Sequence, residues 1–316
     1  MDTTSAIRPQ RRPRFRRASE PLAFRLTEDD VEIIRQVARH RLIRSTHIAE
    51  LVDRSQDRTN DRLLRLFHAG YIDRPRAQLD YYPTAGSAPI IYALADRGAR
   101  LLTERDGIAL ADVGWSRKNR EAGRPFIEHQ IEIVNFQVAL QHAARSRHDV
   151  RLLHPEEIIT VSRRLARVSR DAFALHAKVL HRGHARESGV IPDFVFGIAL
   201  ADGSRRNFMV EIDRGTMPIN RSDPDRTSFE RKMRTYLAAH TTKQHVRQFG
   251  WQSFRVLIVT TDHYRECSMR DALRRIHAPS GLGASLFWFA TFDDVRGRDL
   301  LTYEWRDGNL RAMRLS

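Results

Sequence analysis

Cysteine, lysine and long apolar runs are all scarce in this sequence of 316 residues. The single cysteine, Cys267, excludes an intramolecular disulfide and is typical of a protein from a reducing compartment. No apolar run is long enough to span a bilayer, and the N-terminus lacks the hydrophobic core of a secretion signal. We therefore expect a soluble, cytoplasmic protein that does not enter a membrane.

Positive charge comes almost entirely from arginine, because Lys118, Lys178, Lys232 and Lys243 are the only lysines. Lysine and arginine together number 54 against 39 acidic residues, which leaves a net charge of +15 and a pI near 10.9. An excess of this size points to a polyanionic partner. The length predicts two domains, each able to bury a core.

Residues 1–25 combine arginines with prolines, which oppose compact structure, so we expect a disordered basic arm. Arms of this kind commonly follow phosphates or enter a minor groove of DNA. The candidate DNA contacts in it are Arg14, Arg16 and Arg17. A solubilising tail is the alternative.

Residues 26–106 predict a winged helix-turn-helix domain. Helices are expected over residues 27–40, 46–52 and 57–69, strands over 71–73 and 90–94, and a closing helix from Asp96. Gly70-Tyr71-Ile72 and the later string from Tyr92 to Leu102 resemble the wing and closing helix of many bacterial winged-helix regulators. The third helix would enter the major groove of double-stranded DNA. Its candidate contacts are Arg58, Thr59, Asn60, Arg62 and Arg65. A dimerisation or protein-docking module is the alternative.

Residues 107–125 mix glycine, proline and charge, which predicts a linker over 107–124 and a second domain over 125–316. That domain begins with a strongly periodic helix over residues 126–144, whose polar strip holds Glu128 and Glu132. A first strand is expected over 150–160 and an irregular basic insertion over 162–188. The histidines in the insertion have no cysteine beside them, which argues against a zinc site. Further strands are expected over 255–260 and 286–291, a helix over 268–277, and a terminal hairpin over 301–315.

The most informative stretch runs from Val190 to Tyr236. Two runs rich in β-branched and aromatic residues, joined by a polar break at residues 202–206, predict a pair of strands. Alternation places Glu211 and Asp213 on one face of the second strand, and Asp193 of the first strand could bring a third carboxylate near them. Carboxylates crowded in this way require a cation or a basic group. A following helix presents Lys232 at the edge of its apolar face.

Pro192-Asp193 followed by Glu211 resembles the PD-(D/E)xK signature of restriction-endonuclease-like nucleases. That signature has a lysine where this sequence has Asp213, but some branches of the superfamily carry the lysine on the next helix, where Lys232 lies. The resemblance implies a mixed-sheet nuclease-like domain in an α/β (α+β) protein. It also implies Asp193, Glu211, Asp213 and Lys232 as catalytic residues. The three acids, with Glu128 from the first helix, would hold Mg²⁺ or Mn²⁺.

The whole sequence from about Thr27 to Val295 resembles the bacterial replication-relaxation family. A strand that ends Val210-Glu211-Ile212-Asp213-Arg214 and a helix with Lys232 and Tyr236 are its most specific parts. The layout is also similar to that of MOB-C plasmid relaxases. The resemblance implies three kinds of partner. They are double-stranded DNA at a plasmid or mobile-element origin, other replication or mobilisation proteins, and a second copy of the chain. Two functions stay open: a metal-dependent DNA-nicking endonuclease, and a non-catalytic DNA-binding accessory factor or transcriptional regulator with a degenerate nuclease-like domain.

Overall fold

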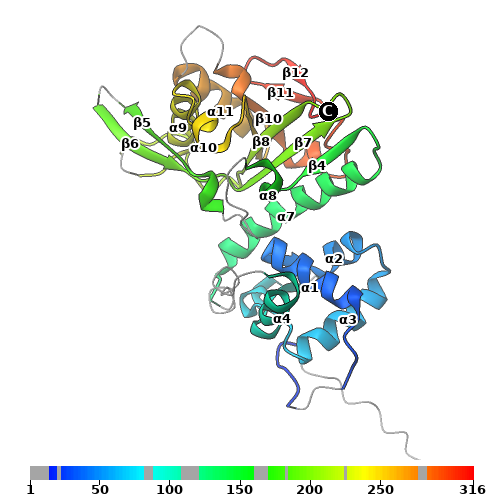
Figure 1. Ribbon diagram of the computed structural model, residues 1–316. Helices are drawn as coiled ribbons and strands as arrows, with labels where there is room; N and C mark the ends of the chain where they lie inside the picture. The colour runs from blue at the N-terminus through cyan, green and yellow to red at the C-terminus, as the bar shows by residue number, and fades with distance from the viewer. Residues whose placement is uncertain are drawn as a thin grey trace, which may run out of the picture. The chain divides into compact units, whose positions relative to one another are not determined.

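The computed structural model describes residues 14–19, 23–81, 88–107, 121–159, 170–181, 184–223, 226–276 and 283–316. The fold is α/β, as predicted, with helices and mixed sheets (Figure 1). The chain divides into two compact units, Met1–Ile131 and Glu132–Ser316. None of the helices within the described ranges is long and apolar enough to cross a membrane.

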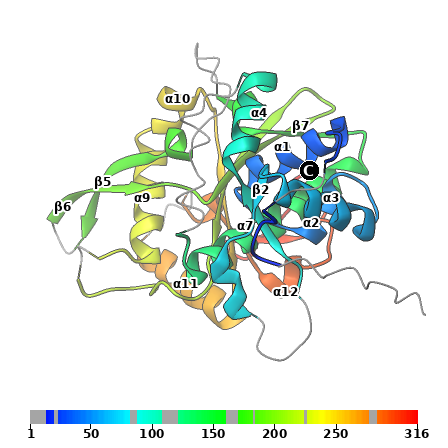
Figure 2. The ribbon, with the colours of Figure 1, turned by 90° about the horizontal axis from the view of Figure 1, so that it is seen from below.

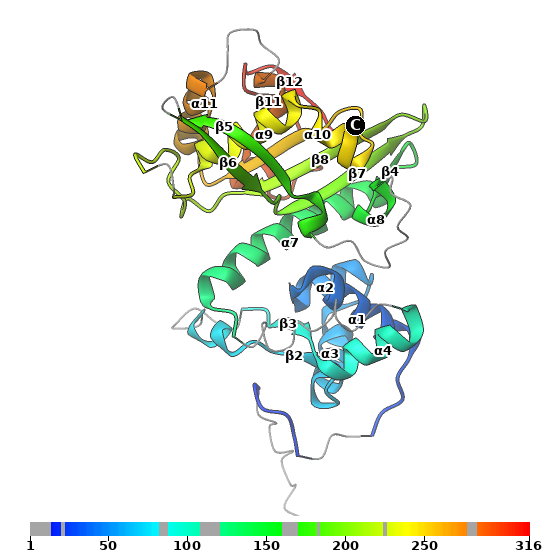
Figure 3. The same ribbon diagram turned by 60° about the vertical axis from the view of Figure 1, so that its left-hand side comes forward.

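The N-terminal unit contains the predicted helices in the predicted order (Figure 3). They are α1 (Glu28–His40), α2 (Ser45–Leu51), α3 (Gln56–His68) and the closing helix α4 (Asp96–Asp106). Thr27 caps α1, because its hydroxyl accepts from the Asp30 amide while Asp30 accepts from the Thr27 amide. The chain leaves α3 through Gly70, whose φ of 83° favours glycine.

A three-stranded antiparallel sheet completes this unit. Strands β2 (Ile72–Asp73) and β3 (Ile91–Leu94) are the two that the sequence predicted. β1 (Leu42–Arg44), which pairs with β3 on its other side, was not predicted. A short 3₁₀ helix, η1 (Arg76–Tyr81), follows β2, and the rest of the expected wing, residues 82–87, lies outside the described residues.

The basic arm is not free along its whole length, and that part of the prediction is wrong. Arg17 donates to the carbonyls of Phe67 (2.9 Å) and Ile72 (3.1 Å). The amide of Ala18 donates to His68 Nδ1 at 3.0 Å. These bonds fix the short segment 14–19 to the end of α3 and to β2, because the last carbonyls of a helix need donors from elsewhere. Residues 1–13 and 20–22 lie outside the described residues.

The boundary between the units falls inside helix α7 (Arg124–Arg145), later than the expected linker at 107–124. Ile127 and Ile131 of α7 are buried in one cluster with Leu42, Ile91 and Ala93. Apolar side chains on the first turns of the helix therefore complete the N-terminal core, which is why the boundary lies after them. Residues 108–120 of the expected linker lie outside the described residues.

The C-terminal unit is built on a seven-stranded mixed sheet in the order β12-β11-β10-β9-β8-β7-β4. Its strands are β4 (Val150–Leu153), β7 (Phe194–Leu200), β8 (Arg205–Ile212), β9 (Arg255–Thr260), β10 (Phe287–Thr291), β11 (Trp305–Asp307) and β12 (Ala312–Met313). β8, β9 and β10 run parallel to one another. β7 is antiparallel to β8, so its first residue lies at the carboxyl end of β8, with Phe194 opposite Val210.

Alternation along β8 places successive side chains in two different cores, as predicted. Phe208 and Val210 belong to the core under α7, together with Phe136 and Leu140 of that helix. Met209 belongs to the opposite core, which is covered by α9 (Phe229–Thr241), α10 (Gln244–Phe249) and α11 (His263–Ile276). Glu211, two residues after Met209, therefore faces α9.

Two expectations for residues 150–190 are wrong. The strand expected over 150–160 ends at Leu153, because Pro155 starts the short helix α8 (Pro155–Ile158). The insertion expected to be irregular contains a regular hairpin, β5 (Leu175–His181) and β6 (His184–Val190). Figures 1 and 2 both show this hairpin alongside α9. Alternate residues of β5 are buried, as a strand on a core requires, but the exposed Leu180 after Val179 breaks the apolar period in the sequence.

Candidate active site

The carboxylate of Glu211 is buried at the end of β8, with two donors from α9. Lys232 Nζ lies 2.6 Å from Glu211 Oε2, and the Tyr236 hydroxyl donates to Glu211 Oε1 at 2.6 Å. Lys232 and Tyr236 are four residues apart on a helix and so share one face. The structure therefore brings Glu211 and Lys232 together.

Asp193 approaches the same point from the start of β7. Its amide donates to the Val210 carbonyl (2.9 Å), and its Oδ2 accepts from the Ile212 amide (2.9 Å). Asp193 thus bonds the backbone on both sides of Glu211, through its amide to Val210 and through its carboxylate to Ile212. Burial raises the pKa of Glu211 above its usual value, and although the charge of Lys232 opposes this, the Asp193 carboxylate adds to the increase.

Asp213 does not join these two acids, which corrects the expectation of three converging carboxylates. Its Oδ2 accepts from the Thr260 hydroxyl at 2.7 Å, and its Oδ1 accepts from Arg265 Nη2 at 2.9 Å. Arg265 Nε also donates to Asp213, and its Nη2 donates to the Met217 carbonyl as well. Arg265 thus neutralises Asp213 and ties the end of β8 to α11. Within the described ranges, Asp193, Glu211 and Asp213 do not form a group with three ligand atoms close enough for one metal ion.

Comparison with known proteins supports the relationship that the residues indicate. A model of the replication-relaxation family matches residues 34–251, more than half of the chain. The chain belongs to the replication-relaxation family. This membership places it among proteins related to replication or mobilisation. Neither the curated proteins nor the solved structures contain a significant match.

The replication-relaxation match covers the N-terminal unit from residue 34 onwards and also the Glu211 site. It includes Asp193, Glu211 and Lys232, together with Tyr236, and it ends at Trp251. Arg265, which holds Asp213, lies beyond its end. The parts of the site that sequence reasoning found therefore lie in the region that this protein shares with its family.

Glu128, the fourth expected metal ligand, lies in the N-terminal unit and accepts from Arg124 Nε at 3.0 Å. Glu132, the neighbouring candidate on the same polar strip, accepts from the Asn135 side chain at 2.9 Å. Both acids are half-buried and have local partners on α7 at a spacing of three or four residues, as neighbours on a helical face commonly do.

The expected DNA-reading residues of α3 do not all face outwards. Arg58, Asn60 and Arg65 are exposed, whereas Thr59 is completely buried and cannot contact DNA. Arg62 Nε donates to Asp30 Oδ1 at 2.7 Å, and Asp30 is itself fully buried. The prediction is therefore wrong for Thr59, and Arg62 has a structural role that helical spacing alone did not reveal.

The basic arm also contains a predicted DNA contact that bonds to the protein itself. Arg14 and Arg16 are exposed, as DNA contacts require, and Arg17 is the residue whose guanidinium bonds to the main chain of the domain. Arg14 also has a main-chain role, since its carbonyl accepts from Arg74 Nη1.

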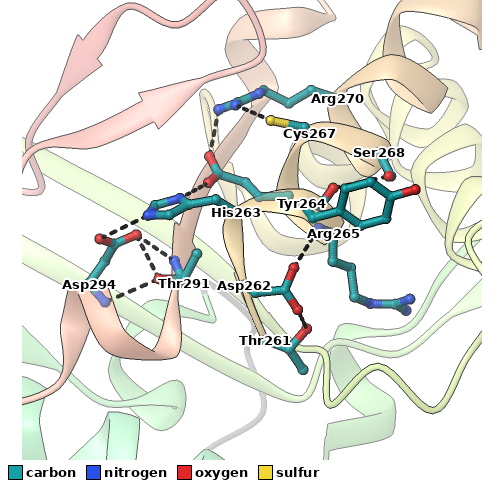
Figure 4. Close-up of polar contacts among 11 residues, drawn as sticks. Thr261, Asp262, His263, Tyr264, Arg265, Cys267, Ser268, Arg270, Thr291 and Asp294 are labelled. Atoms are coloured by element: carbon teal, nitrogen blue, oxygen red, sulfur yellow. Dashed lines mark hydrogen bonds and ion pairs between the residues drawn. The ribbon is translucent and has the colours of Figure 1, made fainter.

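A second polar group lies at the carboxyl ends of β9 and β10 (Figure 4). His263 Nδ1 lies 3.0 Å from Glu266 Oε2, and His263 Nε2 lies 3.8 Å from Asp294 Oδ1. Elsewhere in the structure, within the described ranges, no three His, Cys, Asp or Glu side chains offer ligand atoms as close to one another. The two acids face different ring nitrogens, and Arg270 Nη1 bonds Glu266 Oε1 at 2.5 Å. A protonated imidazole that donates to Glu266 and forms an ion pair with Asp294 fits this geometry better than a metal ion, which would need one nitrogen directed at a shared centre.

Sequence reasoning missed three functional contacts in this unit: the Tyr236 hydroxyl on Glu211, Arg265 on Asp213, and the polar group around His263. The spacing of Tyr236 four residues after Lys232 was a usable signal for the first. Arg265 is 52 residues from Asp213, and one arginine among so many has no sequence feature that marks it as the partner.

Proposed function

We propose that this replication-relaxation protein binds duplex DNA through its N-terminal unit and nicks one strand at a divalent-metal site around Glu211. The observation that carries the proposal is the 2.6 Å contact between Lys232 Nζ and Glu211 Oε2, with Asp193 bracketing the same residue. An acid pair and a lysine are the elements of the PD-(D/E)xK signature, and here the lysine comes from the helix after the strand.

The residues present fit a divalent cation with two protein ligands. Asp193 and Glu211 would hold Mg²⁺ or Mn²⁺ through carboxylate oxygens, which these ions prefer. Crowded carboxylates without a cation have raised pKa values, and the pKa of Glu211 is raised. When bound, the ion would act as a Lewis acid on the phosphodiester and favour deprotonation of a bound water.

The chain's own groups have separate roles in this proposal. Lys232 holds a positive charge at Glu211, where it would stabilise the charge that develops on the reacting phosphate. Tyr236 fixes the orientation of the Glu211 carboxylate through its hydroxyl. Arg265 removes Asp213 from the ligand set by pairing with it. Both oxygens of Glu211 already accept from α9, so a cation would compete with these donors.

In the N-terminal unit, the exposed residues Arg58 and Asn60 on α3 support DNA binding through the major groove. The net charge of +15 supports the same partner, since phosphate contacts made by arginine release counterions. Arg14 and Arg16 would add contacts to the backbone of the DNA.

The test is incubation of the protein with supercoiled plasmid and Mg²⁺ or Mn²⁺. We expect a nicked circle that depends on the metal and is lost in Glu211→Gln and Asp193→Asn. Asp271→Asn, an exposed acid on α11 paired with Arg274, is the matched control and should nick like the wild type. Circular dichroism of each variant shows whether it is folded. Nicking that persists in folded Glu211→Gln would refute the proposed site.

One observation favours a second candidate, a DNA-binding accessory factor that does not cleave. Asp213 is neutralised by Arg265 and both oxygens of Glu211 are occupied, so the acids are compensated without a metal. The same experiment separates the two functions. Retention of plasmid in a gel shift, without nicking in either metal, would establish the accessory role.

A further inference from the structure

A pocket lined by arginine lies beside α9, between the β5–β6 hairpin and the segment that leads into the helix. Figures 2 and 3 both show the hairpin against this helix. The guanidinium groups that line the pocket belong to Arg186, Arg221, Arg226, Arg231 and Arg234. They come from three separate segments of the chain, so the fold brings together positive charges that the sequence keeps apart.

Among the described residues that line this pocket, five are arginines and two, Asp223 and Glu230, are acids. Glu230 Oε1 accepts from Arg234 at 2.9 Å and 2.7 Å, and Asp223 Oδ2 lies 3.4 Å from Arg226 Nε. Guanidinium groups gathered in this way create a positive potential, which favours an anion beside them.

Besides Arg234, whose Nε donates to Glu230, two further arginines are held by bonds through Nε. Arg221 Nε donates to the Thr227 carbonyl at 3.0 Å, and Arg231 Nε donates to the Ser188 hydroxyl at 3.1 Å. A hydrogen bond at Nε restrains the plane of the guanidinium group, so the side chain loses less conformational entropy when its other nitrogens bind a further partner. Ser228 caps α9 at the same place, so the positive end of a 13-residue helix adds to the field.

We propose that this pocket binds a phosphate group of a DNA strand, at a position other than the reacting phosphodiester. The inference rests on the proposed DNA-nicking function and adds an anchoring site to it. Guanidinium groups bind phosphate through paired hydrogen bonds, which makes arginine the usual residue for such contacts.

A strand of nucleic acid fits the surroundings better than a small free anion. A second hollow, lined by Pro218, Asn220, Arg221, Ser222, Asp223 and Arg226, adjoins the first and shares Arg221, Arg226 and Asp223 with it. Two adjoining polar hollows can receive successive phosphates of one chain. Arg231 also directly precedes Lys232, so a strand held at the pocket is bound to the same helix that carries the active-site lysine.

The test measures how the affinity for a duplex oligonucleotide of arbitrary sequence depends on salt. The variants are Arg186→Gln and Arg221→Gln, singly and together, with Arg311→Gln as control, since Arg311 is exposed on the β11–β12 turn far along the chain. Each lost phosphate contact lowers the slope of log K against log salt by about one. We expect the double variant to lose about two units of slope and Arg311→Gln to lose none. Thermal melting of each variant establishes that it is folded.

Inorganic phosphate is the second probe. If the pocket serves a DNA phosphate, phosphate at millimolar concentration should compete with DNA on the wild type and have less effect on the double variant. A pocket that binds inorganic phosphate while the pocket variants keep the full salt slope would overturn the inference in favour of a free anion. An unchanged slope without phosphate binding overturns it entirely. Failure of the wild type to bind any DNA would instead refute the proposed function, so the two failures are distinguishable.

Discussion

Lys232 Nζ lies 2.6 Å from Glu211 Oε2, although 21 residues separate the two in the sequence. The Glu211 side chain is almost completely buried, while that of Lys232 is 21% exposed. The lysine thus extends from the surface of α9 to a carboxylate inside the sheet. An ion pair with one fully desolvated member depends strongly on its partner, because the buried charge has no water to replace it.

The first prediction concerns how strongly the stability of the fold depends on the ion pair between Glu211 and Lys232. Lys232→Met should lower the free energy of unfolding by about 3–5 kcal/mol, since it leaves Glu211 buried without its cation. Glu211→Gln in the same chain removes the charge as well, so the double variant should recover most of the loss. Urea unfolding of the four members of this cycle measures the coupling. Additive effects would mean that the two side chains do not interact in solution.

The second prediction separates buried from exposed ion pairs on α11. Arg265 and Asp213 have side chains 16% and 3% exposed, so Arg265→Met should destabilise the protein by about 3–5 kcal/mol. Arg274 and Asp271 have side chains 59% and 55% exposed, so Arg274→Met should cost about 0–1 kcal/mol. Chemical denaturation of both variants gives the comparison. Equal effects would show that Asp213 is hydrated or paired elsewhere.

The central strands and their two faces could be predicted because their signal is local. Phe208, Val210 and Met209 alternate along β8 in the printed sequence, and the structure puts them in two different cores. Lys232 could be predicted for a similar reason, because it lies at the edge of an apolar helical stripe. The capping box that Thr27 forms with Asp30 is another local pattern, because its two residues lie three positions apart in the sequence.

The features that the sequence did not predict all depend on contacts between distant parts of the chain. Arg62 lies on the polar side of its helix, and nothing nearby in sequence shows that Asp30 is buried beneath it. Arg17 looks like part of a solvated basic tail until the end of α3 is placed beside it. The β5–β6 hairpin was missed because the exposed Leu180 breaks the apolar alternation of β5 and because β6 is largely polar, so that packing on α9 decides which face is buried.

The third prediction uses two arginines of α3. Burial disfavours the charged form of Asp30, but hydrogen bonds from Arg62 and Thr27 outweigh it and lower the pKa of this carboxyl. Arg62→Gln should therefore reduce the free energy of unfolding by about 1.5–3 kcal/mol. Arg58→Gln, on the exposed side, should change it by less than about 0.5 kcal/mol while weakening DNA binding.

The pH dependence provides a further check on Arg62. A lowered pKa in the folded state stabilises the protein above the unfolded pKa of Asp, about 3.9, and this contribution is lost as the pH falls through the folded value. Without Arg62 the folded pKa rises, so acid unfolding of Arg62→Gln should begin at higher pH than that of Arg58→Gln. Identical acid transitions would contradict a structural role for Arg62.

The last prediction concerns His263, whose ring nitrogens face Glu266 and Asp294 (Figure 4). The hydrogen bond with Glu266 and the charge of Asp294 raise the pKa of His263 above its usual value. A raised pKa stabilises the folded state fully below the unfolded value of about 6.5, and this contribution is lost as the pH rises through the folded pKa. The ring is 73% exposed, so solvent screening keeps the effect on stability small.

A titration followed by NMR of the histidine C–H signals measures the pKa of His263 directly. Asp294→Asn should lower the pKa of His263, while Asp293→Asn, an acid on the same turn that pairs with Arg296, should leave it unchanged. An equal shift in both variants would show that His263 responds to general charge and makes no specific bridge between α11 and the end of β10.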